Sequence, residues 1–172
     1  IGGDHITSLL ADHNGYLWVG FAPFGLDRYD PRTGRFVHVR ADGLDDGVAL
    51  SGAERLCEDA HGRIWMNAEI GRIRSNAEVA TTWHTFVVDP ARSSDLAVID
   101  PRELRPGIEP LTNGKVSMGP GGDPWFASPE TIRCVHYGND GSARLIDHNL
   151  GIRSWTELGL PLHPALIADP SS

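Results

Sequence analysis

One short segment recurs along the chain of 172 residues, and this recurrence limits the possible folds more than any other feature. The first copy is residues 6–20 (ITSLLADHNGYLWVG), the second is residues 53–67 (AERLCEDAHGRIWMN), and the third is residues 113–127. Residues 165–170 (ALIADP) match the beginning of a fourth copy. Recurrence at about 50 residues is typical of an array of similar supersecondary units. The sequence therefore predicts a fold built of repeated modules.

Each copy has the pattern of a β-hairpin, in which two alternating strands flank a turn of the form Asp-x-x-Gly. In the first copy, the carboxylate of Asp12 can accept backbone N–H bonds across the turn, and Gly15 can take a left-handed conformation. Trp18 lies on the second strand, where a large aromatic ring is suited to packing between neighbouring sheets. We expect structural roles for the corresponding residues of all three copies, which are Asp12, Gly15, Trp18, Asp59, Gly62, Trp65, Gly122 and Trp125.

The rest of the first unit supplies two more strands. Residues 25–29 alternate and predict a third strand, residues 30–34 (DPRTG) predict a turn, and residues 35–40 predict a fourth strand. Four antiparallel strands in about 40 residues form the meander of a propeller blade. The predicted fold class is all-β, a β-propeller fragment of three four-stranded antiparallel blades plus the first strand of a fourth.

We predict that residues 1–172 form a single partial propeller. The predicted modules are blade 1 at about 6–48, blade 2 at about 53–111 with a long loop at 89–111, blade 3 at about 113–162, and the start of blade 4 at 163–172. The strands expected in blade 2 are 53–58, 63–67, 71–75 and 83–88. The strands expected in blade 3 are 115–119, 124–128, 132–137 and 143–148. Three blades and one strand do not close a ring, so we expect the remaining blades to come from the same polypeptide or from another copy.

Composition argues against several kinds of partner. The chain has 23 acidic and 15 basic residues and a net charge of −8, without a long run of one sign, which disfavours contact with nucleic acid or an anionic membrane. No apolar run is long enough for a membrane span, and the first residues lack a signal-peptide pattern. Cys57 and Cys134 fall on strands of different units, so we expect two small buried side chains rather than a disulfide or a metal pair. We expect no cofactor.

The first unit closely resembles the two-component regulator propeller repeat of bacterial sensor proteins. The residues that carry this resemblance are Ile6, Asp12, Gly15, Leu17 to Gly20, Gly25, Leu26, Tyr29 and Asp30. The second unit is also similar to the repeats of streptogramin (virginiamycin B) lyases, through Gly62 to Trp65 and Ile70 to Ile73. In the third unit Gly119 replaces the turn aspartate. The resemblance to the regulator repeat implies a sensor in signal transduction, in a periplasmic or extracellular location.

Three kinds of function fit this blade type. The resemblance implies a ligand-sensing or binding module of a larger bacterial extracytoplasmic sensor or regulator, which takes a small molecule or an oligosaccharide. A metal-dependent enzyme like the streptogramin lyases and a protein-interaction scaffold are the alternatives. Streptogramin lyases use a His and Glu pair with magnesium, and no position here carries that pair with metal-ligand spacing on a strand. We therefore expect a non-catalytic role and assign no catalytic residue.

Ligands of propellers usually bind at the mouth of the central channel, on loops between blades and between second and third strands. Long loops on a rigid scaffold are also where specificity tends to lie. The candidate ligand-binding residues on these loops are His5, Phe24, Asp45, Asp46, Glu69, Arg102, Glu130 and His163.

Overall fold

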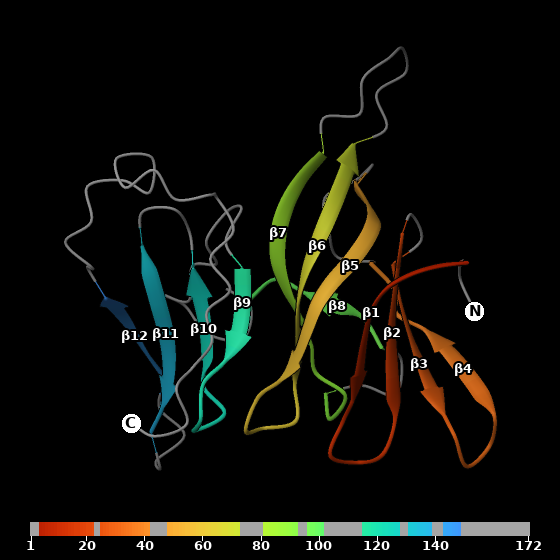
Figure 1. The fold of residues 1–172 in the computed structure, drawn as a ribbon, viewed down its shortest axis with the longest axis horizontal. Helices are drawn as coiled ribbons and strands as arrows, with labels where there is room; N and C mark the ends of the chain where they lie inside the picture. The colour runs from red at the N-terminus through yellow and green to blue at the C-terminus, as the bar shows by residue number, and fades with distance from the viewer. Residues whose placement is uncertain are drawn as a thin grey trace.

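A computed structural model describes residues 4–22, 25–41, 48–72, 81–92, 96–101, 115–127, 131–138 and 143–148 of the chain. The described residues form three four-stranded antiparallel sheets (Figure 1). This architecture confirms the predicted all-β fold of three blades. The predicted first strand of a fourth blade, at 163–172, lies outside the described residues.

Sheet 1 contains the first repeat, and its strands follow one another in chain order. They are β1 (His5–Ala11), β2 (Leu17–Ala22), β3 (Gly25–Asp30) and β4 (Arg35–His38). The polar turns between strands fall where the Asp-x-x-Gly and Asp-Pro-Arg-Thr-Gly segments predict them. The prediction for this unit is therefore confirmed strand by strand.

Sheet 2 differs from the prediction in its second half. Its strands are β5 (Val48–Glu58), β6 (Ile64–Arg72), β7 (Thr81–Val88) and β8 (Val98–Ile99). The predicted third strand at 71–75 is wrong, because β6 continues through Gly71, which pairs with Ala49 on one side and Thr81 on the other. The segment predicted as the fourth strand, 83–88, belongs to the third strand, β7.

The fourth strand of sheet 2 lies inside the segment that was predicted as an irregular loop, 89–111. It is the two-residue strand β8, which pairs with the end of β7 through Val98 and Ile99. Val98 is buried in the core between sheets 1 and 2. Burial of this apolar side chain explains why so short a segment joins the sheet.

Sheet 3 contains the third repeat and matches the prediction closely. Its strands are β9 (Lys115–Met118), β10 (Pro124–Ala127), β11 (Ile132–Tyr137) and β12 (Ala143–His148). Within this sheet each strand pairs with its neighbour in the sequence. All three repeats therefore share one meander topology.

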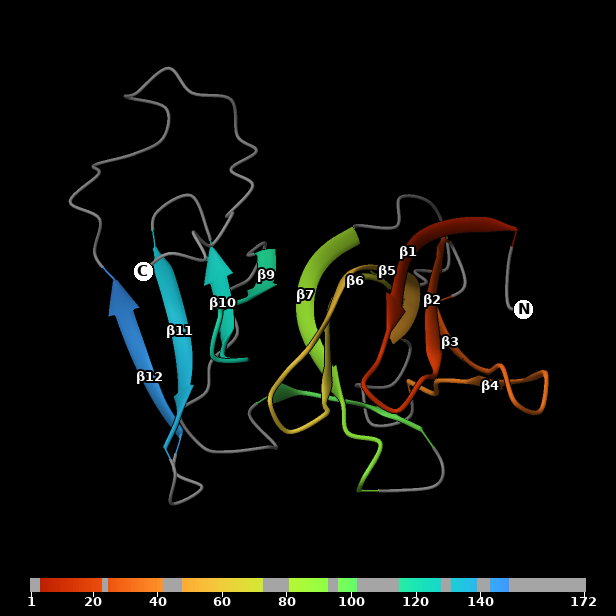
Figure 2. The ribbon, with the colours of Figure 1, turned by 60° about the horizontal axis from the view of Figure 1, so that its bottom comes forward.

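The sheets are arranged like a fan around their first strands. β1 contacts β5 and β5 contacts β9, while β4 and β12 lie at the outer sides (Figures 1 and 2). Main-chain hydrogen bonds also join the outer parts of sheets 1 and 2, where Arg40 bridges to the segment around Ala97 in a parallel arrangement. The first strands therefore lie together at the inner side of the described structure.

Two apolar cores fill the spaces between the sheets. Trp18 packs between sheets 1 and 2 with residues that include Ile64 and Met66, and Trp65 packs between sheets 2 and 3 with residues that include Val116 and Phe126. Both indoles are fully buried. Along β6 successive side chains point to opposite faces, so Ile64 and Met66 face sheet 1 while Trp65 faces sheet 3. Sheet 2 is thus covered on both sides.

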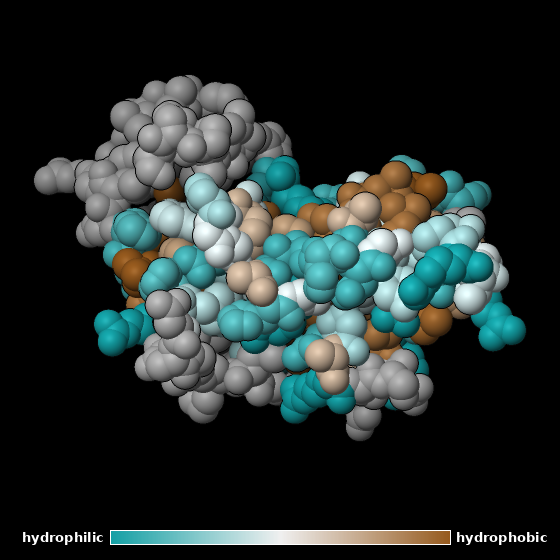
Figure 3. Space-filling view, turned by 90° about the horizontal axis from the view of Figure 1, so that it is seen from below, coloured by the Kyte–Doolittle hydropathy of each residue, from teal (hydrophilic) through white to brown (hydrophobic). Residues whose placement is uncertain are grey.

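The end sheets leave apolar side chains at the surface. The exposed large apolar residues are Ile6, Leu9, Phe36 and Val37 of sheet 1 and Ile146 of sheet 3. Seen from below, apolar atoms gather on the right-hand side, where Figure 1 places sheet 1 (Figure 3). Within the described part of the chain, no helix has the length and apolar character needed to cross a membrane.

Candidate functional site

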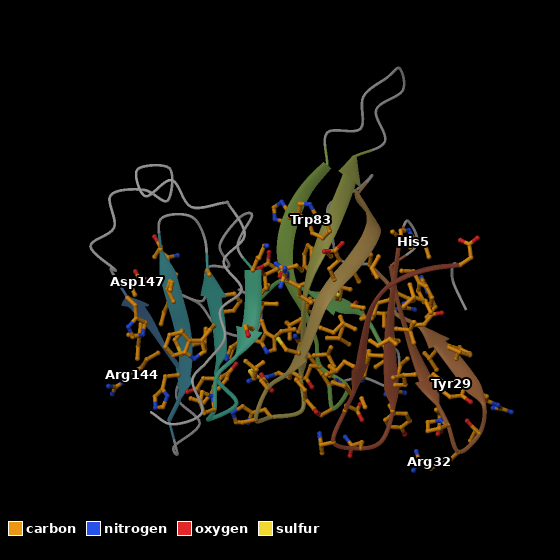
Figure 4. The ribbon with its side chains drawn as sticks, viewed as in Figure 1. His5, Tyr29, Arg32, Trp83, Arg144 and Asp147 are labelled. Carbon is orange, nitrogen blue, oxygen red and sulfur yellow. The ribbon has the colours of Figure 1, made fainter. Side chains whose placement is uncertain are left out.

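The sheets have two ends with different features. The end that carries the three repeated turns, at 12–15, 59–62 and 119–122, is called the turn end. Tyr29 and Arg32 lie near this end, whereas His5 and Trp83 lie near the other, which is called the open end (Figure 4). The sequence predicts ligand residues on the loops between blades and between second and third strands.

Two of the predicted ligand residues lie on described strands. His5 is exposed and begins β1, where it pairs with Ala22. The backbone of Glu69 lies on β6, paired with Gly52 and with Trp83. The other predicted ligand residues lie outside the described part of the chain, namely Phe24, Asp45, Asp46, Arg102, Glu130 and His163.

Trp83 was missed as a candidate ligand residue. It lies near the beginning of β7, directly beside Glu69, and its side chain is half-buried. An indole that is only partly covered can stack on the apolar face of a ligand. Trp83 lies near the open end because β7 is the third strand of sheet 2 and not the fourth (Figure 4).

A second group of polar side chains lies on the inner first strands. Glu54 and Arg55 belong to β5, and Lys115 begins β9. Arg55 is exposed and has a left-handed backbone, with φ of 52°. Burial lowers the pKa of Lys115, and the nearby positive charge of Arg55 lowers it further, while Glu54 opposes the shift. The pattern of the repeats did not single out these residues.

The turn aspartates accept hydrogen bonds from the backbone of their own turns. Asp12 Oδ1 accepts hydrogen bonds from the backbone N–H groups of Asn14 and Tyr16, at 3.0 and 2.9 Å. Its second oxygen accepts a bond of 2.8 Å from the indole N–H of Trp18. The turn therefore fixes the ring that packs between the sheets, a contact that the prediction did not include.

The turn of sheet 2 repeats this arrangement with more partners. Asp59 accepts the backbone N–H groups of His61 and Arg63, the indole N–H of Trp65 at 2.8 Å and the Nε–H of Arg63 at 2.7 Å. The hydroxyl of Tyr137, from sheet 3, lies 3.4 Å from Asp59 Oδ2 and donates to it. Desolvation raises the pKa of Tyr137, so this hydroxyl keeps its proton. The Asp59 carboxylate is fully buried and joins two sheets.

In the third turn the aspartate is absent and the geometry excludes one. Gly15, Gly62 and Gly122 all have positive φ. A Cβ at Gly119, however, would overlap Trp125 Nε1 and lie 2.9 Å from its Cδ1. The indole of Trp125 stacks on His148 and is partly exposed. Trp125 therefore lies outside the two cores, unlike Trp18 and Trp65.

Substitution of Gly119 by aspartate, which would restore the repeat pattern, is expected to destabilise the protein. The new side chain would displace the Trp125 ring, because the overlap involves the ring edge rather than a flexible group. We expect a loss of about 1–3 kcal/mol, measured by chemical denaturation. The matched variant Gly121→Asp, whose Cβ would meet only the carboxylate of Asp123 at 3.7 Å, is expected to lose less. Equal or greater stability of Gly119→Asp would contradict this geometry.

One histidine joins the turns of sheets 1 and 2. The backbone N–H of His13 donates to Glu58 Oε2 at 2.9 Å, and its ring Nδ1 pairs with Glu58 Oε1. The hydrogen bond and the charge of Glu58 raise the pKa of His13 above its ordinary value of 6.5. The stabilisation from this pair is therefore fully present when the pH is below 6.5, the ordinary pKa of histidine. It is lost as the pH rises through the raised pKa of His13.

Replacing His13 by glutamine is expected to remove this part of the pH dependence. The wild-type protein should lose more stability than the variant between about pH 5.5 and about pH 8.5. Denaturant midpoints at both pH values measure the difference. Glu58→Gln should have the same effect, and the double variant should show no further change. A pH dependence that is unaltered in both single variants would show that the pair contributes nothing.

Several other described histidines lie on strands or turns next to a carboxylate or an aromatic ring. His38 Nδ1 lies 2.7 Å from Asp27 Oδ1, and His136 Nδ1 lies 2.7 Å from Asp123 Oδ2. His61 packs edge-on against Tyr137. Among the described residues, no three or more His, Cys, Asp or Glu side chains are grouped so that they could hold a metal ion.

Both cysteines are free thiols on different sheets. Cys57 lies on β5 beside the core of sheets 2 and 3, and Cys134 is buried on β11. Desolvation raises the pKa of Cys57 to about 12 and that of Cys134 to about 11. Because the thiolate is the reactive form, neither group is activated as a nucleophile at neutral pH.

The topology and the packing define the class of protein as one built of β-propeller blades. The family described as two component regulator propeller matches residues 1–22, which confirms the resemblance found in the first repeat. Among solved structures, the chain is similar to the extracellular domain of a putative hybrid two component system from B. thetaiotaomicron, with 12% sequence identity and a TM-score of 0.26. That match covers 86% of this chain and 29% of the other chain, so this chain spans less than a third of that structure's length. No curated protein matches the chain.

Proposed function

We propose that this chain is part of a ligand-sensing β-propeller in a bacterial extracytoplasmic sensor or regulator. The observation that carries the proposal is the agreement between the regulator repeat at residues 1–22 and the three sheets of the same topology. A blade scaffold by itself does not determine an activity. The choice of sensing over catalysis rests on the resemblance of the first repeat and on the turn aspartates, whose carboxylates bind their own turns and neighbouring side chains.

The ligand of this module is a small molecule or an oligosaccharide that binds at the open end. His5 and Trp83 supply an imidazole and a partly exposed indole near that end (Figure 4). Aromatic rings of this kind bind sugars through their apolar faces, while polar groups around them fix the orientation. The predicted loop residues would complete the site from the connections between the sheets.

Further blades complete the propeller, from the same polypeptide or from another copy. Three four-stranded sheets are one fewer than the smallest propellers contain, since these have about four blades. The exposed apolar residues of sheets 1 and 3 support this proposal, because in sheet 2 both faces are covered by neighbouring sheets.

The test is a binding survey of the purified chain with neutral and charged oligosaccharides, followed by titration calorimetry of each compound that raises the melting temperature. Trp83→Ala is expected to weaken the binding of the selected compound about tenfold, equal to about 1.4 kcal/mol. Tyr29→Ala removes a partly exposed aromatic side chain near the turn end and should leave affinity unchanged. Chemical conversion of the bound compound, or equal affinity of both variants, would contradict the proposal.

A further inference from the structure

The turn of sheet 1 contains a pair of residues with a chemistry of its own, Asn14 followed by Gly15. Both residues are exposed. The side-chain amide of Asn14 has no hydrogen-bond partner among the described residues, and a Cβ added at Gly15 would meet nothing within 4 Å. The open space at Gly15 leaves room for its backbone nitrogen and the side-chain carbon Cγ of Asn14 to approach one another.

Among the three described turns, only the turn of sheet 1 has this pair. The equivalent positions are 61–62 in sheet 2, with the sequence His-Gly, and 121–122 in sheet 3, with the sequence Gly-Gly. Asn67, the other described asparagine, is buried on β6 and its side chain is hydrogen-bonded. The second Asn-Gly pair of the sequence, at 113–114, lies outside the described residues.

We propose that Asn14 is a site of spontaneous deamidation, since asparagine is one of the chemically labile residues. The nitrogen of Gly15 attacks Cγ of Asn14 and loses its proton to water, and the Cγ–Nδ2 bond breaks as ammonia leaves, which closes a succinimide ring. Glycine favours this step because no side chain crowds its nitrogen. Water then opens the ring, and the inference is independent of the proposed sensing function.

The ring opens to two products. Attack of water on Cγ gives aspartate at position 14. Attack of water on the main-chain carbonyl carbon breaks the original peptide bond to Gly15 instead and gives isoaspartate, in which the main chain runs through Cγ. Both products carry a carboxylate in place of the neutral amide, so each adds one negative charge to the turn.

The native turn slows the first step without preventing it. The backbone N–H of Gly15 donates to the backbone oxygen of Asp12 at 3.0 Å, and this bond must break before the nitrogen can attack. Exposed turns open locally at a free energy far below that of global unfolding. We therefore expect the reaction to occur in the folded chain, at a lower rate than in the unfolded chain.

The isoaspartate product does not fit the hydrogen bonds of this turn. Asp12 Oδ1 accepts the backbone N–H groups of Asn14 and Tyr16, at 3.0 and 2.9 Å. Isoaspartate adds one carbon to the main chain between these two donors, so a single oxygen no longer reaches both with good geometry. The new carboxylate also repels that of Asp12, which is buried. Because Asp12 Oδ2 accepts the indole N–H of Trp18, we expect this bond to weaken as well.

The experiment incubates the full folded chain in mildly alkaline buffer, which favours loss of the amide proton, and follows the products by peptide mapping with mass spectrometry. We expect products at Asn14 and none at Asn67 in the same sample. Ion-exchange chromatography then isolates the isoaspartate form. In that form the Trp18 indole proton is expected to exchange about tenfold faster than in the unreacted chain, while the Trp65 indole proton exchanges at an unchanged rate.

Asn14→Gln is the matched variant, because it keeps a side-chain amide and the pair at 113–114 but closes the corresponding ring far less readily. It should retain slow exchange of the Trp18 indole proton throughout the incubation. An intact Asn14 in the folded chain, when the chain in denaturant has reacted, would overturn the proposal. Unchanged exchange of the Trp18 proton in the isoaspartate form, or equally accelerated exchange in incubated Asn14→Gln, would overturn it as well.

Discussion

Replacing Trp65 by alanine is expected to lower the free energy of unfolding by about 3–5 kcal/mol. The Trp65 side chain is fully buried in the core between sheets 2 and 3. Its ring meets that of Phe126 edge to face, with centroids 5.5 Å apart, and its N–H donates to Asp59. Truncation removes the ring from both sheets at once and leaves a cavity. Chemical denaturation of the chain measures the loss.

Trp125 supplies the matched control for this substitution. It occupies the corresponding position of sheet 3, yet its indole is partly exposed and stacks on His148 at 5.1 Å. Trp125→Ala is therefore expected to cost less than half as much as Trp65→Ala. A similar loss in the two variants would show that the two rings are equally buried and would contradict the packing described above.

Replacing Asp59 by alanine is expected to have an effect of similar size, about 3–5 kcal/mol. The carboxylate is fully buried and accepts hydrogen bonds from the backbone of its turn, from Arg63, from Trp65 and from Tyr137. Its removal leaves the buried guanidinium of Arg63 without its anion and several donors without an acceptor. Each unsatisfied buried donor costs about 1–3 kcal/mol.

Alanine substitutions of two further aspartates provide comparisons for the stability loss of Asp59→Ala. Asp12 accepts three hydrogen bonds and has no charged partner among them, so Asp12→Ala should cost less than Asp59→Ala. Asp30 bonds to Arg32 at the surface, and Asp30→Ala should cost less than either of the other two substitutions. Combining Asp59→Ala with Trp65→Phe removes the orphaned indole N–H, so the losses should be less than additive. A loss of about 1 kcal/mol or less for Asp59→Ala would show that the carboxylate is not the organising group of the turn.

The sequence allowed the turns and most strands to be predicted because their causes are local. Gly15 has a left-handed backbone in a turn whose aspartate lies three residues earlier, and both features are visible in the sequence. The same reasoning found the strands of sheet 3 to within a residue, although its turn aspartate is replaced by Gly119. Alternation and turn residues are sufficient where each strand is short and ends at a polar turn.

The second half of sheet 2 could not be predicted in this way. Gly71 resembles Gly25, which begins the third strand of sheet 1, but Gly71 lies inside β6 with partners on both sides. A glycine does not end a strand when neighbouring strands satisfy its backbone on both sides. β8 has only two residues, and its pairing depends on burial of Val98 against sheet 1, which is a long-range contact.

The candidate site shows the same division between local and long-range causes. The sequence indicated the loops of the open end, where His5 lies, because such loops connect strands in any propeller blade. It did not indicate Arg55 or Lys115, because the left-handed backbone at Arg55 and the approach of β9 to β5 arise from the stacking of two sheets. Trp83 was overlooked because its strand had been assigned to the outer position.

The most direct test of the stacked sheets is a nuclear Overhauser effect between the aromatic protons of Trp65 and Phe126 in the chain labelled at those rings. The two residues lie on different repeats, and their ring centroids are 5.5 Å apart only if sheets 2 and 3 pack face to face. The account predicts a clear cross-peak together with slow exchange of the Trp65 indole proton, which Asp59 holds in the core. Absence of the cross-peak with rapid exchange of that proton would contradict the packing of one repeat on the next.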